Sequence, residues 1–587
     1  MRFLGNVLAT IVGLFVFFML FFFGIILISA VFSGGSDEVP VENNSVIELD
    51  LSLIKNDYAG KFNFKDFDYF EVKHDGLSDV IRAIDEAKTD DNIKGISILN
   101  DESDLGMAQL KALRDELEAF KKSGKFVYAY SNMYSQKEYY LNSVANTVYI
   151  NPIGELDFKG LSSEVLFFKD FQEKSGLKME VIRHGKYKSA VEPFLENEMS
   201  PANREQVLAL LNSVWNSMIS DISKSRNVSV SQLNTIANGL LARTPEMAKT
   251  QKLVDVIAYE DDYHNAIRKV LKVDSDEDYN KIDIKDYADN VAKTVKENSS
   301  KDKIAIIYAQ GEIGNGEGDL NIIGEGSMRR SLQEARKNEN IKAIVLRIDS
   351  PGGNALTSDL IWREIELTKK VKPVVVSMGN YAASGGYYLA CNANKIFAEA
   401  NTITGSIGVF GTLPNFSKLI DKVGIHVEQV NTHENAAEYS VFKPIDEKFR
   451  IVTQESVERI YNTFINRVAA GRKMTFAQVD AIAQGRVWSG TEAVKVGLVD
   501  EIGGMDAALK EAAKLAKINT YKTQNFPQYE KSFDDLLSNL GLPFFKTKEN
   551  FIKEEVGVEN YKIIEQIRKM NTRKGTQILM PFEINIK

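Results

Sequence analysis

Residues 341–353, IKAIVLRIDSPGG, join an uninterrupted apolar run to a turn with two adjacent glycines. The apolar part, 343–348, predicts a strand that is buried on both faces, as strands of parallel sheets usually are. Similar runs at 304–309 and 374–378 predict two further buried strands. These runs decide the fold class of the second half of the chain.

The segment 357–370 connects the last two of these strands and shows helical spacing, with Thr357 or Ser358 as its predicted N-cap. A strand, a helix and a strand in this order place two parallel strands in one sheet. We therefore expect an α/β fold with a largely parallel sheet.

The chain also repeats itself at a constant offset of 248 residues. The triplet NIK at 92–94 recurs at 340–342, and YYL at 139–141 recurs at 387–389. The register holds without a gap as far as Gly176, where the first copy has the same residue as the second. A series of matches in one register indicates an internal duplication. The sequence therefore predicts two related domains in tandem.

The composition shifts along the chain predict its division into segments. We expect an N-terminal membrane anchor over 1–36, a first domain over 46–290, a polar linker over 291–301, a second domain over 302–520, and a tail over 521–587 whose role the sequence leaves open.

The first segment has no charged side chain between Arg2 and Asp37. Its apolar run, 7–32, exceeds the roughly 20 residues that cross a bilayer, and it is longer than the apolar region of about 7–15 residues in a cleavable signal peptide. We expect one transmembrane helix, although cleavage as a signal peptide stays open. Positive charge before the run and acids after it place the N-terminus in the cytoplasm and the remaining chain outside it.

The overall composition narrows the class of protein. Of 587 residues, 44% are hydrophobic and 26% are charged, and the formal net charge is −9. This acidic balance argues against a nucleic-acid partner, which would require a basic face. Cys391 is the single cysteine and excludes an intrachain disulfide. We see neither a metal-ligand cluster nor a nucleotide-binding loop, and we expect no metal and no cofactor.

The two copies differ most where reactive groups are expected. The second copy has DSPGG at 349–353, and the first has DESDL at 101–105. Adjacent glycines after a strand let the backbone turn sharply and present bare N–H groups to a ligand. The second copy also has AASGGY at 382–387, where Ser384 begins a helical stretch with glycines behind it, whereas the first copy has Gln136 at that position. These differences predict a nucleophile in the second copy only.

A serine hydroxyl needs a general base to act as a nucleophile. The chain has five histidines, none with a partner indicated by spacing, and a Ser-His-Asp triad stays open. A lysine held neutral by burial is the alternative base. Lys188 lies in GKYKSAVEPF at 185–194, among small and apolar residues, and its counterpart in the second copy is Ala436. The reciprocal loss favours a serine and a lysine from different halves.

Together, the anchor, the tandem halves and the segments YKSAVEPF, SPGG, MGNYAASGGYY and TGSIGVFG resemble the signal peptide peptidase A family, also called protease IV, in its long (67K-type) form. The resemblance implies two tandem domains of the crotonase/Clp-protease fold. It also implies a membrane-bound serine endopeptidase that cleaves hydrophobic residual signal peptides as a bowl-shaped homotetramer. The enzyme would be a single-pass protein of the bacterial inner membrane, with its catalytic region on the periplasmic side.

By the same resemblance Ser384 is the nucleophile and Lys188 is the base. The N–H groups of Gly353 and Gly385 would bind the oxyanion, and Gly352 would shape the turn. Ser406, which follows a predicted strand and lies between glycines, is our candidate for orienting the lysine, although the sequence leaves the orienting group open.

Two other functions remain compatible with the sequence. A crotonase-type acyl-CoA enzyme would use the glycine turn on a thioester, and a catalytically vestigial membrane scaffold would use neither group. The membrane anchor argues against the first, and the intact serine and lysine argue against the second. Physiological substrates and subsite preference stay open.

Overall fold

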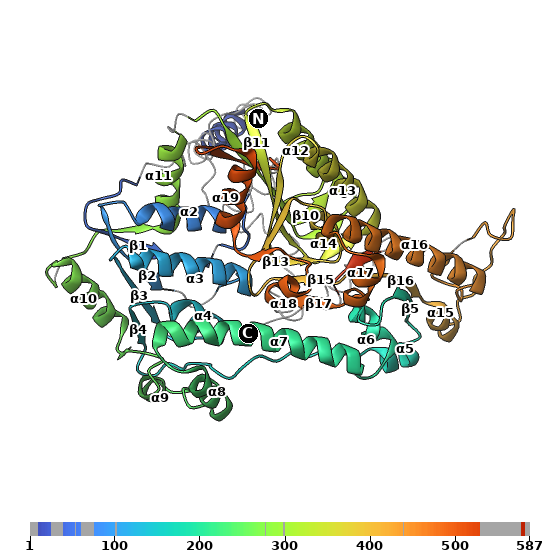
Figure 1. Ribbon diagram of the computed structural model, residues 1–587, viewed down its shortest axis with the longest axis horizontal. Helices are drawn as coiled ribbons and strands as arrows, with labels where there is room; N and C mark the ends of the chain where they lie inside the picture. The colour runs from blue at the N-terminus through green and yellow to red at the C-terminus, as the bar shows by residue number, and fades with distance from the viewer. Residues whose placement is uncertain are drawn as a thin grey trace, which may run out of the picture.

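The computed structural model describes residues 10–24, 39–52, 54–59, 76–99, 103–275, 277–296, 300–437, 439–528 and 577–580. The N-terminal half contains a parallel sheet and the C-terminal half a largely parallel one, each flanked by helices, and a third sheet joins them (Figure 1).

The sheet of the N-terminal half has six strands in the order β6-β4-β3-β2-β1-β7, all parallel. Its strands are β1 (Ser45–Leu49), β2 (Ile93–Leu99), β3 (Phe126–Ser131), β4 (Thr147–Ile150), β6 (Val256–Ile257) and β7 (Lys281–Asp283). Its helices are α2 (Leu77–Ala87), α3 (Met107–Lys122), α4 (Gln136–Asn142), α5 (Lys169–Ser175), α6 (Glu192–Leu195), α7 (Pro201–Arg226), α8 (Val230–Gly239), α9 (Pro245–Thr250), α10 (Glu260–Leu271) and α11 (Ile284–Lys296).

The sheet of the C-terminal half has the order β17-β15-β13-β11-β8-β19, with β14 also beside β13 and β18 beside β14. Its strands are β8 (Lys303–Gln310), β11 (Ile341–Ser350), β13 (Val374–Ala383), β14 (Lys395–Ala398), β15 (Ile403–Gly405), β17 (Val487–Ser489), β18 (Glu501–Ile502) and β19 (Lys522–Phe526). Its helices are α12 (Glu325–Lys337), α13 (Ala355–Lys369), α14 (Gly385–Ala390), α15 (Ser417–Lys422), α16 (Glu447–Arg472), α17 (Phe476–Ile482), α18 (Gly490–Lys495) and α19 (Met505–Ala516).

The α/β fold and the three buried strands of the C-terminal half are confirmed. The predicted runs lie within β8, β11 and β13, which pair in parallel. The predicted N-cap of the helix between them is wrong. Asn354 caps α13, because its side chain accepts a hydrogen bond from the N–H of Thr357 at 3.0 Å and the helix therefore begins two residues before Thr357.

The structure repeats at the offset found in the sequence. Helices α3 and α13 begin 248 residues apart, and the same distance separates the starts of β3 and β13 and those of β4 and β14. The strands β7 and β19 also occupy equivalent edges, beside β1 and β8. The start of the predicted tail is thus part of the C-terminal core.

The third sheet contains strands from both halves in the order β10-β9-β12-β20-β16-β5. Its strands are β5 (Lys178–His184), β9 (Glu312–Gly314), β10 (Ile322–Gly324), β12 (Gly352–Asn354), β16 (Val409–Asn415) and β20 (Gln577–Leu579). Strand β5 of the N-terminal half pairs antiparallel with β16 of the C-terminal half. This pairing carries the residues after β5 into the C-terminal half.

A buried polar seam fixes the two halves against each other. The Arg347 guanidinium binds the Asp57 carboxylate at 2.6 Å, and both side chains are almost fully buried. The Asn380 amide oxygen accepts the N–H groups of Ala108 and Gln109 at the start of α3. Helix α7 runs along the lower edge of the molecule, from α5 and α6 at one end to α8 and α9 at the other (Figure 1).

The predicted anchor and linker lie only partly in the described residues. Residues 10–24 are helical, with apolar side chains such as Phe15 exposed to 71%. Among the residues that the structure describes, no helix meets the length and hydropathy needed to cross a bilayer. The predicted linker begins inside a helix, since α11 continues to Lys296. The exact domain boundaries stay predictions.

Candidate active site

Ser384 lies where β13 ends and α14 begins, and its side chain is fully buried. Its backbone has φ 55° and ψ −112°, a conformation that costs a non-glycine residue about 1–3 kcal/mol. The Ser384 N–H donates to the Gly405 carbonyl at 2.8 Å, and the Ser384 carbonyl accepts the N–H of Tyr388 at 2.9 Å. These contacts hold the strained backbone and aim the hydroxyl at the seam between the halves.

Lys188 reaches this hydroxyl from the other half of the chain. It follows β5, and the pairing of β5 with β16 places His184 opposite Val409. The Lys188 side chain is fully buried, and its Nζ lies 2.9 Å from the Ser384 Oγ. The structure therefore brings together the serine and the lysine that the sequence comparison singled out, each of which is present in one copy and replaced in the other.

Burial lowers the pKa of Lys188 well below its usual value of 10.5, and desolvation is the cause. The Phe410 ring lies 6.0 Å from Nζ and is itself buried. Gly485, with φ 82°, packs against the main chain of Lys188, since a Cβ at this position would lie 2.6 Å from the Lys188 backbone nitrogen. A neutral amine is the form that such surroundings favour.

Ser406 supplies two more contacts to the amine, because its Oγ and its carbonyl oxygen each lie 2.9 Å from Nζ. A neutral amine has two N–H donors and one lone pair. The Ser406 carbonyl can only accept, so it takes one N–H, and the Ser406 Oγ takes the other. The lone pair then faces the Ser384 hydroxyl, which is the geometry that a general base requires.

A buried polar network holds the loop that carries Lys188. Ser189 donates to the Asn203 amide oxygen at 2.9 Å, and Gln206 donates to the Tyr187 carbonyl at 3.0 Å. The Asn203 amide also donates to the Glu192 carboxylate at 2.9 Å. Sequence reasoning missed Asn203 and Gln206, since both are polar residues of α7 with no local motif. The sequence signal that could have indicated them is Glu192 within YKSAVEPF, because a carboxylate among apolar residues needs polar partners.

The glycine turn lies directly against the start of α14. Gly352 and Gly353 have φ 103° and 152°, and a Cβ on Gly353 would lie 2.1 Å from the Ile313 carbonyl oxygen. A Cβ on Gly385 would meet the Gly352 Cα at 3.2 Å. Only glycines fit this approach, which places the backbone of the turn beside that of Gly385.

The C-terminal strand β20 covers the site. Gly352 pairs with Leu579 and Gly353 with Ile578 in antiparallel register, and Phe410 pairs with Gln577. Met580 donates its N–H to the Pro351 carbonyl at 2.7 Å, and its side chain is buried against apolar residues that include Ala383. Strand β20 thus fills a slot one strand wide between β12 and β16.

The histidines lie elsewhere. His184 binds the Glu458 carboxylate at 2.8 Å and stacks on the Tyr461 ring at 3.8 Å. His426 and His433 are exposed, His264 contacts Tyr279, and His74 lies outside the described residues. Within the described chain, no histidine hydrogen-bonds Ser384. The geometry therefore gives no support to a Ser-His-Asp triad.

The remaining candidates are also placed by the structure. Cys391 is buried, and desolvation raises the pKa of its thiol to about 12. Lys186 is exposed beside the Tyr187 ring and does not enter the site. No group of three or more His, Cys, Asp or Glu side chains in the described ranges is arranged to hold a metal ion.

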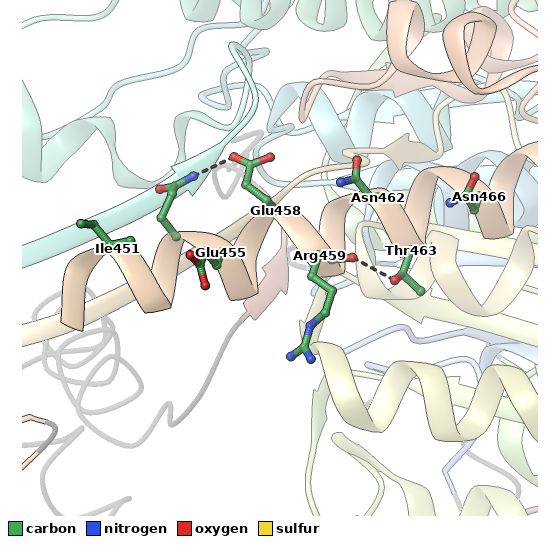
Figure 2. A pocket seen from close by; sticks show the side chains of 8 residues that line it. Ile451, Glu455, Glu458, Arg459, Asn462, Thr463 and Asn466 are labelled. Carbon is green, nitrogen blue, oxygen red and sulfur yellow. Dashed lines mark hydrogen bonds between the residues drawn. The ribbon is translucent and has the colours of Figure 1, made fainter. Parts of the chain in front are cut away.

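A recess of about 640 Å³ lies along the outer face of α16, apart from Ser384 and Lys188. Figure 2 shows its lining along one helix, where Gln454 donates to Glu458. Its lining is Ile451, Gln454, Glu455, Glu458, Arg459, Asn462, Thr463 and Asn466. This shallow recess on one helix contains neither Ser384 nor Lys188, so it is not the candidate active site.

Comparison with known proteins identifies the class. The chain matches peptidase family S49 twice, over residues 119–274 and 366–519. It is 37% identical to Protease 4 of Haemophilus influenzae (74% of this chain, 72% of the relative) and 33% identical to the chloroplastic serine protease SPPA of Arabidopsis thaliana (78% and 68%). A putative signal peptide peptidase SppA of Enterococcus faecium is 34% identical (38% and 67%).

These matches define a serine peptidase. The chain belongs to peptidase family S49, and two copies of the family's domain confirm the duplication and the resemblance to signal peptide peptidase A. Among solved structures, a point mutant of ClpP1 from Listeria monocytogenes aligns with a TM-score of 0.25 and 16% identity over 38% of this chain and 99% of that one. A score this low does not establish a shared fold, so the crotonase/Clp-type fold stays a prediction.

Proposed function

We propose that the protein is a membrane-bound endopeptidase in which Ser384 is the nucleophile and Lys188 is the general base. The carrying observation is the distance of 2.9 Å between the Lys188 Nζ and the Ser384 Oγ, in a fully buried site built from both halves. The neutral amine takes the hydroxyl proton while Oγ attacks the peptide carbonyl. It then returns the proton to the leaving amine, and water hydrolyses the acyl-enzyme.

The N–H groups of Gly353 and Gly385 are the proposed oxyanion donors. Support comes from the close approach of the Gly352–Gly353 turn to the start of α14. Backbone donors held by strands and packing need no reorganisation when negative charge develops on the carbonyl oxygen. Ser406 is the proposed orienting residue, because both of its oxygens contact the amine.

The substrate is proposed to be an extended apolar peptide that enters the slot now filled by β20. Main-chain pairing with Gly352 and Gly353 would position the peptide, as in other proteins that bind a ligand by adding a strand. The apolar residues around Met580, including Tyr381, Ile403 and Val487, suit hydrophobic side chains. Residual signal peptides are the class that fits, and the name of the Enterococcus faecium relative, a putative signal peptide peptidase, supports this choice.

The proposed location is the bacterial inner membrane, with one N-terminal span and the peptidase on the periplasmic side. The apolar run at 7–32 and the charges around it support this topology. A homotetramer is the proposed assembly, and exposed apolar side chains of the α15–α16 region support an interface there. They are Val423, Ile425, Val430, Phe442, Ile451 and Val452.

Covalent labelling by a serine-directed acylating probe tests the proposal. The full-length protein should be labelled at Ser384, located by peptide mass spectrometry, and a Lys188→Met variant should lose the label. A vestigial scaffold would take up no probe. Hydrolysis of an acyl-CoA thioester in preference to a signal peptide would point to the crotonase-type alternative.

A further inference from the structure

Strand β13 is irregular shortly before Ser384, the residue that follows it. The register between β11 and β13 shifts after Ile348, so that residues 379–381 of β13 lie opposite Asp349 alone. Such a bulge interrupts the backbone hydrogen bonds between strands and changes the direction of the strand beyond it. The groups that hold this bulge therefore help to set the position of Ser384.

The Asp349 side chain holds the bulge against β11. Its Oδ1 accepts the N–H of Tyr381 at 2.8 Å, and its Oδ2 accepts the side-chain amide of Asn380 at 3.2 Å. A Cβ on Gly379 would lie 3.0 Å from the Asp349 Cβ, so little room is left for a side chain there. Asp349 also leads directly into the turn at 350–353. One carboxyl group thus ties the strand before the nucleophile to the turn that carries a proposed oxyanion donor.

Asn380 links this carboxyl group to the N-terminal half of the molecule. Its amide oxygen accepts the N–H groups of Ala108 at 3.1 Å and Gln109 at 3.2 Å, in the first turn of α3. Because backbone N–H groups only donate, they fix which end of the Asn380 amide is the oxygen. The other end then donates to the Gln109 Oε1 at 2.7 Å and to Asp349. The start of α3 therefore orients the group that contacts Asp349.

Helix α3 takes its N-terminal cap from the other half of the chain. Its own N-cap residue is Gly106, which has no side chain to accept the free N–H groups of the first turn. The Asn380 amide fills this role, and a Cβ on Gly106 would lie 2.4 Å from the Asn380 Cγ. Gly106 has φ −80° and ψ 171°, which any residue can adopt. The glycine is therefore needed here for space rather than for backbone conformation.

A second contact from the N-terminal half reaches the other end of the bulge. The Arg347 guanidinium donates to the Met378 carbonyl at 3.0 Å and binds the Asp57 carboxylate at 2.6 Å. Asp57 also accepts the Gln109 amide at 3.1 Å. The hydrogen bonds thus run from Asn380 through the N-terminal half and back to β13, on both sides of the bulge.

The equivalent asparagine of the first copy bonds within its own half. Asn132 lies 248 residues before Asn380. Its amide oxygen accepts the Tyr130 hydroxyl at 3.1 Å and the Asn151 amide at 2.9 Å. The two asparagines therefore form a matched pair, in which the contacts of Asn380 cross between the halves.

We propose that Asn380 is a positioning residue, through which the start of α3 fixes the bulge and thereby the placement of Ser384 and of the oxyanion turn. The N-terminal half then acts on the reaction in two ways. Lys188 supplies the base, and α3 holds the strand that leads to the nucleophile. Asn380 acts through Asp349 and takes no part in proton transfer. The inference rests on the proposed function, because it concerns the same serine.

Substitution of Asn380 in the full-length protein tests this role. Asn380→Ala should lower kcat for an apolar peptide by about 10- to 100-fold and leave KM within about twofold, because the displaced groups act in the transition state. Rates are expressed per site labelled by the acylating probe, so that unfolded protein is not counted. Asn132→Ala is the matched control and should keep both constants at the parent values. A parent kcat in Asn380→Ala, or a rise in KM alone, would contradict the proposal.

A peptide aldehyde provides a readout that a loss of stability alone would not change. Ser384 adds to the aldehyde carbon, and the oxygen of the resulting hemiacetal occupies the oxyanion position. The inhibition constant of the aldehyde should rise in Asn380→Ala by about the factor by which kcat falls. An inhibition constant equal to that of the parent would show that the oxyanion turn is not displaced, contrary to the proposal.

Gly106→Ala tests the same contact from the other half and covers a failure of Asn380→Ala to fold. The three atoms nearest to the added Cβ all belong to the Asn380 side chain, so the substitution should lower kcat by about 10-fold or more. In the Asn380→Ala background the collision is absent, and Gly106→Ala should have no further effect. Losses that multiply in the double variant, or a parent kcat in Gly106→Ala, would overturn the link. A parent enzyme that is not labelled at Ser384 would refute the proposed function, and this inference with it.

Discussion

The two halves of the molecule share a frame and differ at one strand end. In the C-terminal half, β13 is followed by Ser384, whose hydroxyl lies 2.9 Å from the amine of Lys188. At the equivalent position of the N-terminal half, Gln136 begins α4, accepts the N–H groups of Lys159 and Gly160, and donates to the Gly160 carbonyl. The same position in the fold thus holds a serine hydroxyl beside an amine in one copy, and in the other a glutamine whose hydrogen bonds fix a neighbouring loop.

The lysine shows the reverse difference. The loop after β5 buries Lys188 in the C-terminal half, whereas its counterpart Ala436 is exposed on the arm between α15 and α16. Burial, which lowers the lysine pKa, therefore comes from docking against the other half and not from the local sequence. Under the proposed function, this difference means that the duplication divided one reaction between two copies.

Ser384→Ala should have the largest effect, a loss of at least about 10⁴-fold in kcat/KM for an apolar peptide, because it removes the nucleophile. Gln136→Ala is the matched change in the other copy. It should lower the free energy of unfolding by about 1–3 kcal/mol, measured by urea denaturation, since it removes the three hydrogen bonds that the buried Gln136 amide makes to residues 159–160. Peptide hydrolysis at the parent rate by Ser384→Ala would contradict the proposal that the C-terminal copy supplies the nucleophile.

Lys188→Met should reduce kcat by about 10³-fold or more, because methionine fills the same space without a base. The parent enzyme should gain activity as the pH rises along a limb set by the Lys188 pKa, well below 10.5. Ala436→Lys is the control and should change neither the rate nor the limb. If the activity of Lys188→Met still rises with pH as in the parent enzyme, Lys188 is not the general base.

The lowered pKa of Lys188 also makes folding stability depend on pH. Between the folded pKa and the unfolded value near 10.5, the unfolded chain binds one more proton than the folded chain, so stability rises with pH in this window. At lower pH the full penalty of burying the charged form remains. Lys188→Met should remove this slope, as measured by urea denaturation at several pH values. A slope equal to that of the parent would contradict burial of the amine.

Ser406→Ala should lower kcat by about 10- to 100-fold, because the amine loses one partner and its lone pair is less well aimed. The Ser406 carbonyl remains, which limits the loss. KM should stay near the parent value, since Ser406 contacts the lysine rather than the peptide slot. Steady-state kinetics separate the two constants, and a rise in KM alone would argue for a role in binding.

Removing β20 should have the smallest effect and the opposite sign. A chain ending at residue 576 should label with the acylating probe about tenfold faster, because a tethered strand in the slot leaves only a minor open population. A chain ending at Met580 keeps the strand and is the control. Equal labelling rates for the two chains would show that β20 does not restrict access.

Much of this division could be predicted from local sequence. The apolar runs at 304–309 and 343–348 became buried strands because only a sheet covered on both faces suits continuous aliphatic residues. The reciprocal exchange of Ser384 and Lys188 was visible in the alignment of the copies. The N-cap of α13 was misplaced, since Asn354 belongs to the glycine turn and only the backbone path shows that the helix begins there.

The sequence by itself determined the duplication, the α/β class and the residues worth pairing, because periodicity and repeat register are properties of the chain alone. The tertiary structure decided the distance between Lys188 and Ser384, the contacts of Ser406, the support from Asn203 and Gln206, and the place of β20 in the slot. Each of these depends on segments far apart in sequence, and their approach is set by the packing of two complete halves.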